Sequence, residues 1–269
     1  MAPNREYKWT IGMKRALYPI STTILILFLW QMSIVLFSLP EFILPSPFVV
    51  IRAFFSQLNL LFNHALVTLY ETIAGLILAI IFSVVISIII VWSKGVEKTI
   101  LPLVVFFQTT PKIAIAPLFI VWFGFGYTPK IIISFWVAYF PIAISMITGL
   151  RDVEPETIDL TKSMSATTLQ TFIKVRIPNS LPHFFSGLKL GGLVAMLGSI
   201  TGEFVGSDAG LGYLIVMANH NHDVKLLFSV LIALVIMGRT IYALTGWIEK
   251  HTISWHVAMR TEEEKFFTA

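Results

Sequence analysis

The sequence is poor in charged residues and has no cysteine. Charged residues make up 13% of its 269 residues, whereas hydrophobic residues make up 56% and the mean hydropathy is +0.82. A soluble domain usually carries about 25% charged residues, so this chain cannot cover a water-facing surface. Intrinsic disorder is excluded because disordered chains are poor in apolar residues. Without cysteine there is neither a disulfide framework nor a thiolate metal site. The composition therefore predicts a membrane protein.

Three common catalytic motifs are also missing. The sequence contains no Gly-x4-Gly-Lys-Ser/Thr loop for nucleotide phosphates, no Gly-x-Ser-x-Gly elbow and no His-Glu-x-x-His helix. His220, His222 and Asp223 form too weak a pattern to predict a metal site. We therefore expect no catalytic residue, no cofactor and no metal, and any energy from ATP has to come from another subunit.

Six apolar stretches are long enough to cross about 30 Å of hydrocarbon as helices. They cover residues 16–38, 65–93, 100–125, 131–150, 183–206 and 226–248. None shows the alternation of a membrane β-barrel strand. We expect an all-α membrane protein whose six transmembrane helices form one domain over residues 16–250, between tails at 1–15 and 251–269. The outer segment 39–64 is expected to hold a short interfacial helix.

The basic residues give the bundle an orientation. If the N-terminus is inside, 13 of the 19 Lys and Arg residues fall in cytoplasmic segments. Three lie in outer loops (Arg52, Lys130 and Lys225) and three within spans (Lys112, Lys189 and Arg239). The positive-inside rule then places both termini in the cytoplasm. Because topology explains the net charge of +4, we expect no nucleic-acid partner.

The longest polar stretch is the predicted cytoplasmic loop 151–182. Pro155 suits the first position of a short helix, and Thr167 and Gln170 have the spacing of a capping box. The next helix carries Leu169, Phe172 and Ile173 on one stripe and is expected to end before Pro178. A solvated connector is the simple interpretation. However, connectors are usually about 4–6 residues long, and short helices with an apolar stripe need a partner, so a docking site is favoured.

The loop resembles the coupling loop of binding-protein-dependent ABC importer permeases. Asp159-Leu160-Thr161 stands where that family has Glu-Ala-Ala, Ser165 stands where it has glycine, and Ile177-Pro178 with Leu181-Pro182 closes the pattern. Other features follow in family order, namely Leu44-Pro45-Ser46-Pro47, Trp122-Phe123-Gly124-Phe125-Gly126, Glu203-Phe204 and Gly210-Leu211-Gly212-Tyr213. The resemblance assigns ATPase coupling to Asp159, Ser165, Ala166, Leu169, Phe172, Ile173 and Pro178.

The resemblance also implies an architecture and partners. It implies the type I ABC importer permease fold in a bacterial inner membrane, a homodimer, two cytoplasmic ATP-binding subunits and an extracytoplasmic solute-binding protein. The sequence is most similar to the branch for nitrate, sulfonates, taurine, thiamine pyrimidine precursors and riboflavin. Gln108-Thr109-Thr110-Pro111-Lys112 and Thr68-Leu69-Tyr70-Glu71 favour the last two solutes.

Ionisable side chains within the spans are candidates for a translocation path, because a charge at membrane depth is costly unless it faces protein or water. Glu71, Lys112 and Glu203 could line or gate the path, or could form a structural ion pair; the sequence does not decide between the two. Lys189 and Arg239 are expected to reach the interface or backbone carbonyls. A rival hypothesis is a stand-alone proton-coupled secondary transporter that uses Glu71, Lys112 and Glu203 as a relay.

Small residues recur along the fifth predicted span. They are Gly187, Gly191, Gly192, Ala195, Gly198, Ser199 and Gly202. Close helix packing is the usual reason for such a run in a membrane protein, and lining of a permeation path is the sharper alternative.

Overall fold

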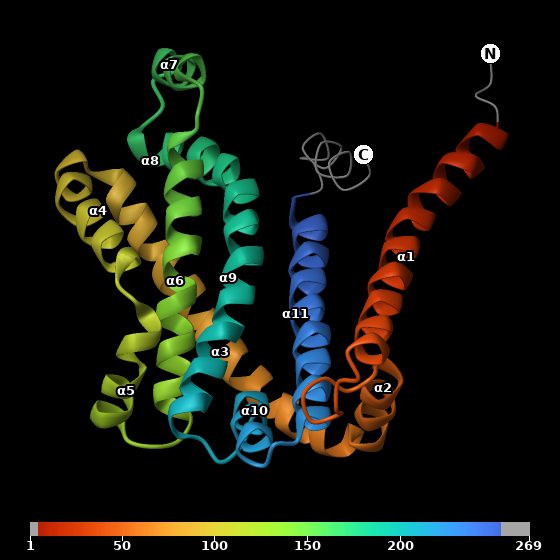
Figure 1. The fold of residues 1–269 in the computed structure, drawn as a ribbon. Coiled ribbons are helices and arrows are strands. Elements are labelled where there is room, and N and C mark those ends of the chain that lie inside the picture. Colours follow the sequence, from red (N-terminus) through yellow and green to blue (C-terminus); the bar gives the residue numbers. More distant parts are fainter. Residues whose placement is uncertain (1–4, 254–269) are drawn as a thin grey trace.

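The structure, a computed structural model, describes residues 5–253 apart from the side chains of residues 5–17, 19, 112 and 113. Every regular element in that range is a helix (Figure 1). In chain order the elements are α1 (Arg5–Leu36), α2 (Pro47–Ser56), α3 (Leu58–Trp92), α4 (Lys94–Thr109), α5 (Lys112–Phe123), α6 (Tyr127–Arg151), α7 (Pro155–Ser163), α8 (Thr168–Thr171), the π-helix η1 (Phe172–Arg176), α9 (Ile177–Gly206), α10 (Leu211–His220) and α11 (Val224–Thr252).

The all-α membrane class is confirmed, whereas the span count stays a prediction. Four helices are long and apolar enough to cross a membrane: α3, α6, α9 with its preceding turns, and α11. A fifth span results if α4 and α5 count as one. In α1 the apolar part with described side chains covers Ile20–Leu36, just short of the usual length for a span. The start of α1 and the end of α11 lie at the same end of the molecule as α7 (Figure 1). The tail residues 254–269 lie outside the described part of the chain.

The third predicted span, 100–125, is not one continuous helix in the structure. It is broken into α4 and α5, which meet at an angle of 104°. The break falls at Thr110 and Pro111, and both residues have extended backbone conformations. Proline lacks a backbone N–H and disfavours helical geometry in the residue before it, so the chain bends there.

The predicted outer segment 39–64 contains one short helix and the start of a long one. The short helix is α2, which Ser46 caps by accepting a hydrogen bond from the backbone N–H of Val49. The helix ends at Ser56, and α3 begins at Leu58. His64, which was expected to end the interfacial segment, therefore lies in the first part of α3.

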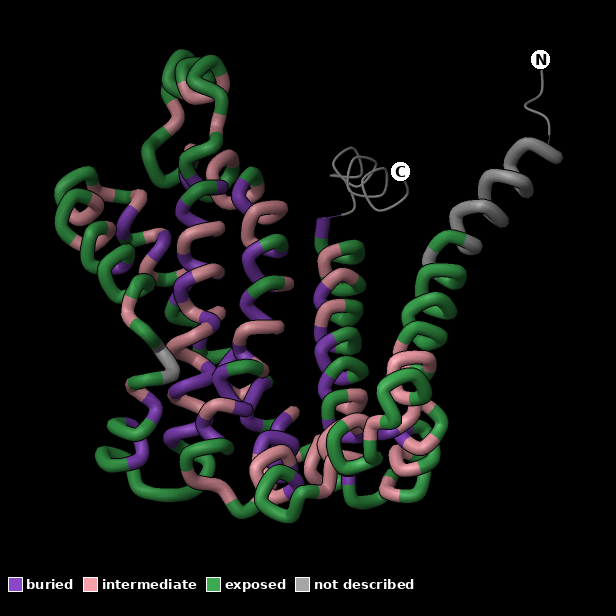
Figure 2. The backbone as a smooth tube through the Cα atoms, viewed as in Figure 1, coloured by how far each residue is buried: buried purple, intermediate pink, exposed green. Residues whose placement is uncertain are grey.

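Glycines bring the backbones of α3, α6 and α9 close together. A Cβ atom on Gly198 of α9 would lie 2.8 Å from the Cα of Ser134 in α6. A Cβ atom on Gly75 of α3 would lie 2.8 Å from the backbone nitrogen of Phe135. Both are closer than real Cβ contacts, so only glycine fits. The small-residue run in α9 thus packs against α6, and the buried residues concentrate where these helices meet (Figure 2).

Candidate functional site

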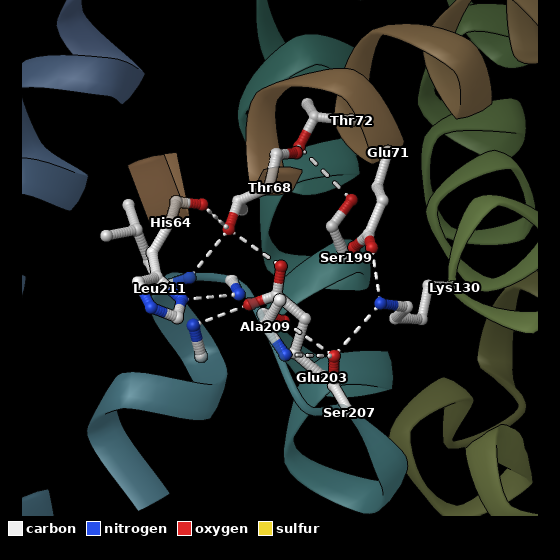
Figure 3. A network of polar contacts seen from close by, with 12 residues as sticks. His64, Thr68, Glu71, Thr72, Lys130, Ser199, Glu203, Ser207, Ala209 and Leu211 are labelled. Atoms are coloured by element: carbon white, nitrogen blue, oxygen red, sulfur yellow. Dashed lines mark hydrogen bonds and ion pairs between the residues drawn. The ribbon is translucent and has the colours of Figure 1, made fainter. Parts of the chain in front are cut away.

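Three ionisable side chains from three helices meet at the end of the bundle opposite α7. Glu71 lies on α3, Lys130 on α6 and Glu203 on α9 (Figure 3). Their exposed fractions are 0%, 3% and 2%. The helices that carry them are held together by the glycine contacts described above. This cluster and its hydrogen-bonding neighbours are called the outer network below.

Lys130 is the cation of the outer network. Its Nζ atom lies 2.5 Å from Oε1 of Glu71 and donates a hydrogen bond of 2.9 Å to Oγ of Ser207. The expectation that Lys130 sits in an outer loop is therefore wrong. Lys130 lies in the first turn of α6, directly before the apolar stretch 131–150, and its side chain is buried among the neighbouring helices. A search for ionisable residues just outside each apolar stretch could have found it.

Glu203 holds the beginning of α10. Its Oε1 accepts a hydrogen bond of 2.7 Å from Oγ1 of Thr68, and its Oε2 accepts one of 2.5 Å from the backbone N–H of Gly212. The backbone N–H of Leu211 donates to Thr68 Oγ1 at 2.8 Å. A carboxylate at a helix N-terminus satisfies free N–H groups and interacts favourably with the helix dipole. Gly210 has a φ of +112°, which glycine adopts without strain.

Two further contacts extend the outer network to its rim. The backbone N–H of Gly210 donates a hydrogen bond of 3.0 Å to Nδ1 of His64, and the His64 ring stacks on Tyr213. On the other side, Oγ1 of Thr72 donates a hydrogen bond of 3.1 Å to Oγ of Ser199. The outer network therefore ties α3, α6, α9 and α10 together.

Lys112 is not placed in the outer network. It begins α5, but its side chain lies outside the described residues, so its predicted pairing with Glu71 or Glu203 stays a prediction. Within the described side chains the network contains two carboxyl groups and one ammonium group. Lys189, in contrast, pairs with Glu249 at 2.8 Å near the end of α11. Arg239 is exposed in the middle of α11.

The loop at the opposite end folds largely as its sequence predicts. Pro155 begins α7, and the capping box is present: the backbone N–H of Thr167 donates to Gln170 Oε1 at 2.8 Å, and that of Gln170 donates to Thr167 Oγ1 at 3.2 Å. Ser165 has a φ of +55°, the left-handed conformation that glycine would adopt more easily. Serine thus keeps the turn that the family pattern forms with glycine.

The remaining loop residues differ in exposure. Asp159 is exposed and pairs with Lys162 at 2.8 Å. Ala166 is half-buried, and its backbone N–H donates to the carbonyl of Thr161 at 3.0 Å. Leu169 and Ile173 are more than half exposed.

Phe172 differs from its neighbours in being buried. It is 4% exposed, and its ring lies 5.3 Å from that of Trp92 at the end of α3. The expectation that Phe172 shares an exposed stripe with Leu169 and Ile173 is therefore wrong. Helical spacing groups these residues, but it does not reveal that the chain's own core covers one edge of the stripe.

The helix that was expected to end before Pro178 continues instead. α8 runs through the π-helix η1 into α9, and Pro178 occupies the first turn of α9. A π-helix is wider than an α-helix and changes the hydrogen-bonding register, so the missing N–H of proline is tolerated at this junction.

Comparison with known proteins identifies the family. Residues 85–254 match the family described as the binding-protein-dependent transport system inner membrane component. The chain belongs to this family. It is 37% identical over 243 residues to a probable ABC transporter permease protein of Haemophilus influenzae, covering 90% of this chain and 99% of that protein.

Two relatives with named solutes are also similar to the permease. The formylaminopyrimidine transport permease protein ThiX of Halalkalibacterium halodurans is 31% identical, with 90% of this chain and 98% of that protein covered. The riboflavin transport system permease protein RibX of Chloroflexus aurantiacus is 33% identical, with 88% and 89% covered.

The fold matches that of a solved transporter. A chain of the MetNI methionine ABC transporter in an inward-facing conformation superposes with a TM-score of 0.65 at 20% identity, covering 73% of this chain and 97% of that one. The permease therefore has the type I ABC importer permease fold, as the sequence predicts. It is a multi-pass protein of the bacterial inner membrane and a subunit of an ABC importer for a small solute.

Proposed function

We propose that the permease works as a homodimer with two cytoplasmic ATP-binding subunits and an extracytoplasmic solute-binding protein. Its family is described as binding-protein-dependent, which supports the delivery protein. The absence of a phosphate-binding loop from the sequence supports a separate ATPase. Closure of the ATPase pair on ATP would bias the permease between inward-open and outward-open states, because a partner shifts a two-state equilibrium by its differential affinity.

The loop 155–177 is proposed to dock on the ATPase. The observation that carries this proposal is the exposure of apolar side chains between α7 and η1, at the end of the molecule where α7 projects beyond the bundle (Figure 1). Leu160 is 60% exposed, Met164 74%, Leu169 54% and Ile173 53%. A nine-residue helix such as α7 is marginal by itself, and a partner groove that covers these exposed apolar side chains would stabilise it.

The docking proposal is tested with charges placed on the exposed face. Leu169→Asp and Ile173→Asp are expected to weaken ATPase binding at least about tenfold, as loss of an interface anchor does, and to abolish ATP-driven uptake. Thr168→Asp is the matched control, because it adds the same charge at an exposed first helical position where an acid is favourable. Normal uptake by both Leu169→Asp and Ile173→Asp would contradict docking at this loop.

Glu71, Lys112 and Glu203 are proposed to gate or line the outer end of the path. Support comes from the burial of both carboxyl groups in a cluster with a single described ammonium group, which is unusual for a purely structural ion pair at membrane depth. The same cluster joins three long helices to α10, so its rearrangement would move all of them. Glu203→Gln is expected to reduce uptake without loss of ATPase binding, and unchanged uptake would contradict the gate.

The solute is proposed to be a thiamine pyrimidine precursor or a riboflavin-like heterocycle. The names of two relatives above 30% identity support this, whereas a putative aliphatic sulfonates transport permease of Bacillus subtilis is 28% identical. The test measures uptake of labelled riboflavin, a 4-aminopyrimidine, taurine and nitrate by the assembled transporter. Uptake restricted to taurine or nitrate would overturn the assignment.

A liposome assay distinguishes the proposed ATP-driven importer from a stand-alone proton-coupled transporter. Purified permease alone in liposomes with an imposed proton gradient should move no solute, and uptake should require the ATPase and ATP. Proton-driven uptake by the isolated chain would overturn the importer proposal.

A further inference from the structure

The short helix α8 and the π-helix after it divide their apolar residues between two environments. Leu169 and Ile173 are exposed, whereas Phe172, which lies between them in sequence, is 4% exposed. The π-helix begins at Phe172. Side chains in a widened turn point in different directions from those of a regular α-helix, and such turns are frequent at functional sites. One side of this segment therefore faces outward and the other faces the bundle.

Phe172 packs into a buried cluster, called the Phe172 pocket below, to which α3, α6 and α9 contribute. Its ring lies 5.3 Å from the ring of Trp92, tilted by 55°. It belongs to one buried cluster with Met146 and Leu150 of α6, against which Ile88 and Val91 of α3 pack. The covalent chain joins the loop to α6 and α9 only. The Phe172–Trp92 contact therefore brings the loop into contact with α3.

The base of the loop is fixed by hydrogen bonds to the end of α6. Nη1 of Arg176 donates to the carbonyl of Leu150 at 2.8 Å, and Nδ2 of Asn179 donates to the carbonyl of Asp152 at 2.6 Å. His183 also lies 3.2 Å from Asp152. Because the two legs of the loop are tied together at the base, a displacement of the loop is passed to the helix ends instead of being absorbed by a flexible hinge.

A second contact reaches α4 but is weaker. Arg151 pairs with Glu97 at 2.6 Å, and both side chains are about one-third exposed. Ion pairs of that exposure contribute little because solvent screens them. The contact of Phe172, which is 4% exposed, with Trp92, which is 49% exposed, links the loop directly to α3, a helix that the loop does not join covalently.

We infer that Phe172 and Trp92 are positioning residues that transmit movement of the docked loop to α3, while Leu169 and Ile173 hold the ATPase. This inference rests on the proposed docking of the loop. It assigns ATPase binding to the exposed side of one short segment and coupling to α3 to its buried side. It predicts that binding of the ATPase and use of its energy are separable by substitutions three residues apart.

The test uses the full transporter in proteoliposomes, with the permease, its ATPase and its binding protein. Phe172→Ala and Trp92→Ala are compared with Leu169→Asp, and riboflavin and a 4-aminopyrimidine are the transported probes. Three quantities are measured: the affinity of the ATPase for the permease, the rate of ATP hydrolysis and the solute transported per ATP.

Phe172→Ala and Trp92→Ala are expected to keep ATPase affinity within about twofold and to lower transport per ATP about tenfold, the range found for residues that carry coupling between sites. In contrast, Leu169→Asp is expected to lower the affinity of the ATPase for the permease. Phe172→Leu, which keeps most of the apolar volume, should retain at least about half of the coupling, and it also gives a folded variant if Phe172→Ala does not insert.

Two outcomes overturn the inference. If Phe172→Ala loses ATPase affinity as Leu169→Asp does, Phe172 is a docking residue. If Phe172→Ala and Phe172→Leu transport as much solute per ATP as the unmodified chain, Phe172 only fills space. Failure of the docking proposal looks different, because Leu169→Asp would then bind the ATPase and transport normally.

Discussion

The outer network and the Phe172 pocket both connect α3 to α6 and α9, but by different kinds of contact. At the outer end, Glu71, Lys130 and Glu203 are buried and joined by directional hydrogen bonds and an ion pair. At the other end, Phe172 is held by apolar packing against Trp92 and its neighbours. Directional polar contacts break over short distances, whereas apolar surfaces slide with little loss of contact. The difference suits an outer end whose contacts are either made or broken, and an opposite end whose contacts persist while the loop moves.

The largest expected effect comes from breaking the outer ion pair. Glu71→Met leaves Lys130 buried without its carboxylate, and loss of one partner of a buried pair costs about 3–5 kcal/mol of unfolding free energy. The double variant Glu71→Met with Lys130→Met should recover most of that loss, because two apolar side chains fill the same space. Unfolding titrations in mixed micelles measure both. A double variant as unstable as the single one would contradict a simple pairing.

A smaller effect is expected from packing next to the outer network. Gly198→Ala places a Cβ atom 2.8 Å from the Cα of Ser134, so it should destabilise the bundle by about 1–3 kcal/mol. Gly246→Ala is the matched control in α11, where the nearest atom to a new Cβ is Lys189 Cε at 3.9 Å. Alanine favours helix there, so this control should be neutral or slightly stabilising in the same unfolding titration. Equal effects at both positions would contradict tighter packing between α6 and α9.

In the turn between α7 and α8, a substitution is expected to stabilise the protein, unlike the two substitutions above. Ser165→Gly removes the strain of a positive φ and should stabilise the loop by up to about 1 kcal/mol. Ser163→Gly, at the last position of α7, is the matched control and should destabilise it slightly. Protease susceptibility of the loop distinguishes the two. Increased cleavage of the Ser165→Gly variant would argue against strain at this position.

The smallest effect is expected from the Arg151–Glu97 ion pair, which is about one-third exposed and lies at the same end as the loop. Glu97→Gln removes the partner of Arg151 and should change the unfolding free energy by less than about 1 kcal/mol. Comparing the loss of unfolding free energy in Glu97→Gln and Glu71→Met therefore measures how much burial adds to the stability that an ion pair contributes. A loss at Glu97 as large as that at Glu71 would remove the contrast between the two ends.

Local signals in the sequence predict much of the fold. The capping box of Thr167 and Gln170 and the helix start at Pro155 are confirmed because they depend on residues a few positions apart. The burial of Glu71 and Glu203 follows from the cost of charge at membrane depth. Lys130 was missed because its burial depends on α3 and α9, and Phe172 was misplaced because only the folded bundle shows which edge of an apolar stripe is covered. Proline in the third span indicates a break in the helix, but the angle of 104° between α4 and α5 needed the structure.

Gly75, where α3 makes its close contact with α6, divides α3 into a short segment towards Glu71 and a long segment towards Trp92. Gly75 lies four residues from Glu71 and 17 residues from Trp92 along the same oblique helix (Figure 1). At 1.5 Å per residue these arms are about 6 Å and about 25 Å long. A rotation of α3 about Gly75 that moves Trp92 by about 4 Å thus moves Glu71 by only about 1 Å, with the force multiplied in the same ratio. A displacement of that size is enough to separate the Glu71–Lys130 pair beyond hydrogen-bonding distance.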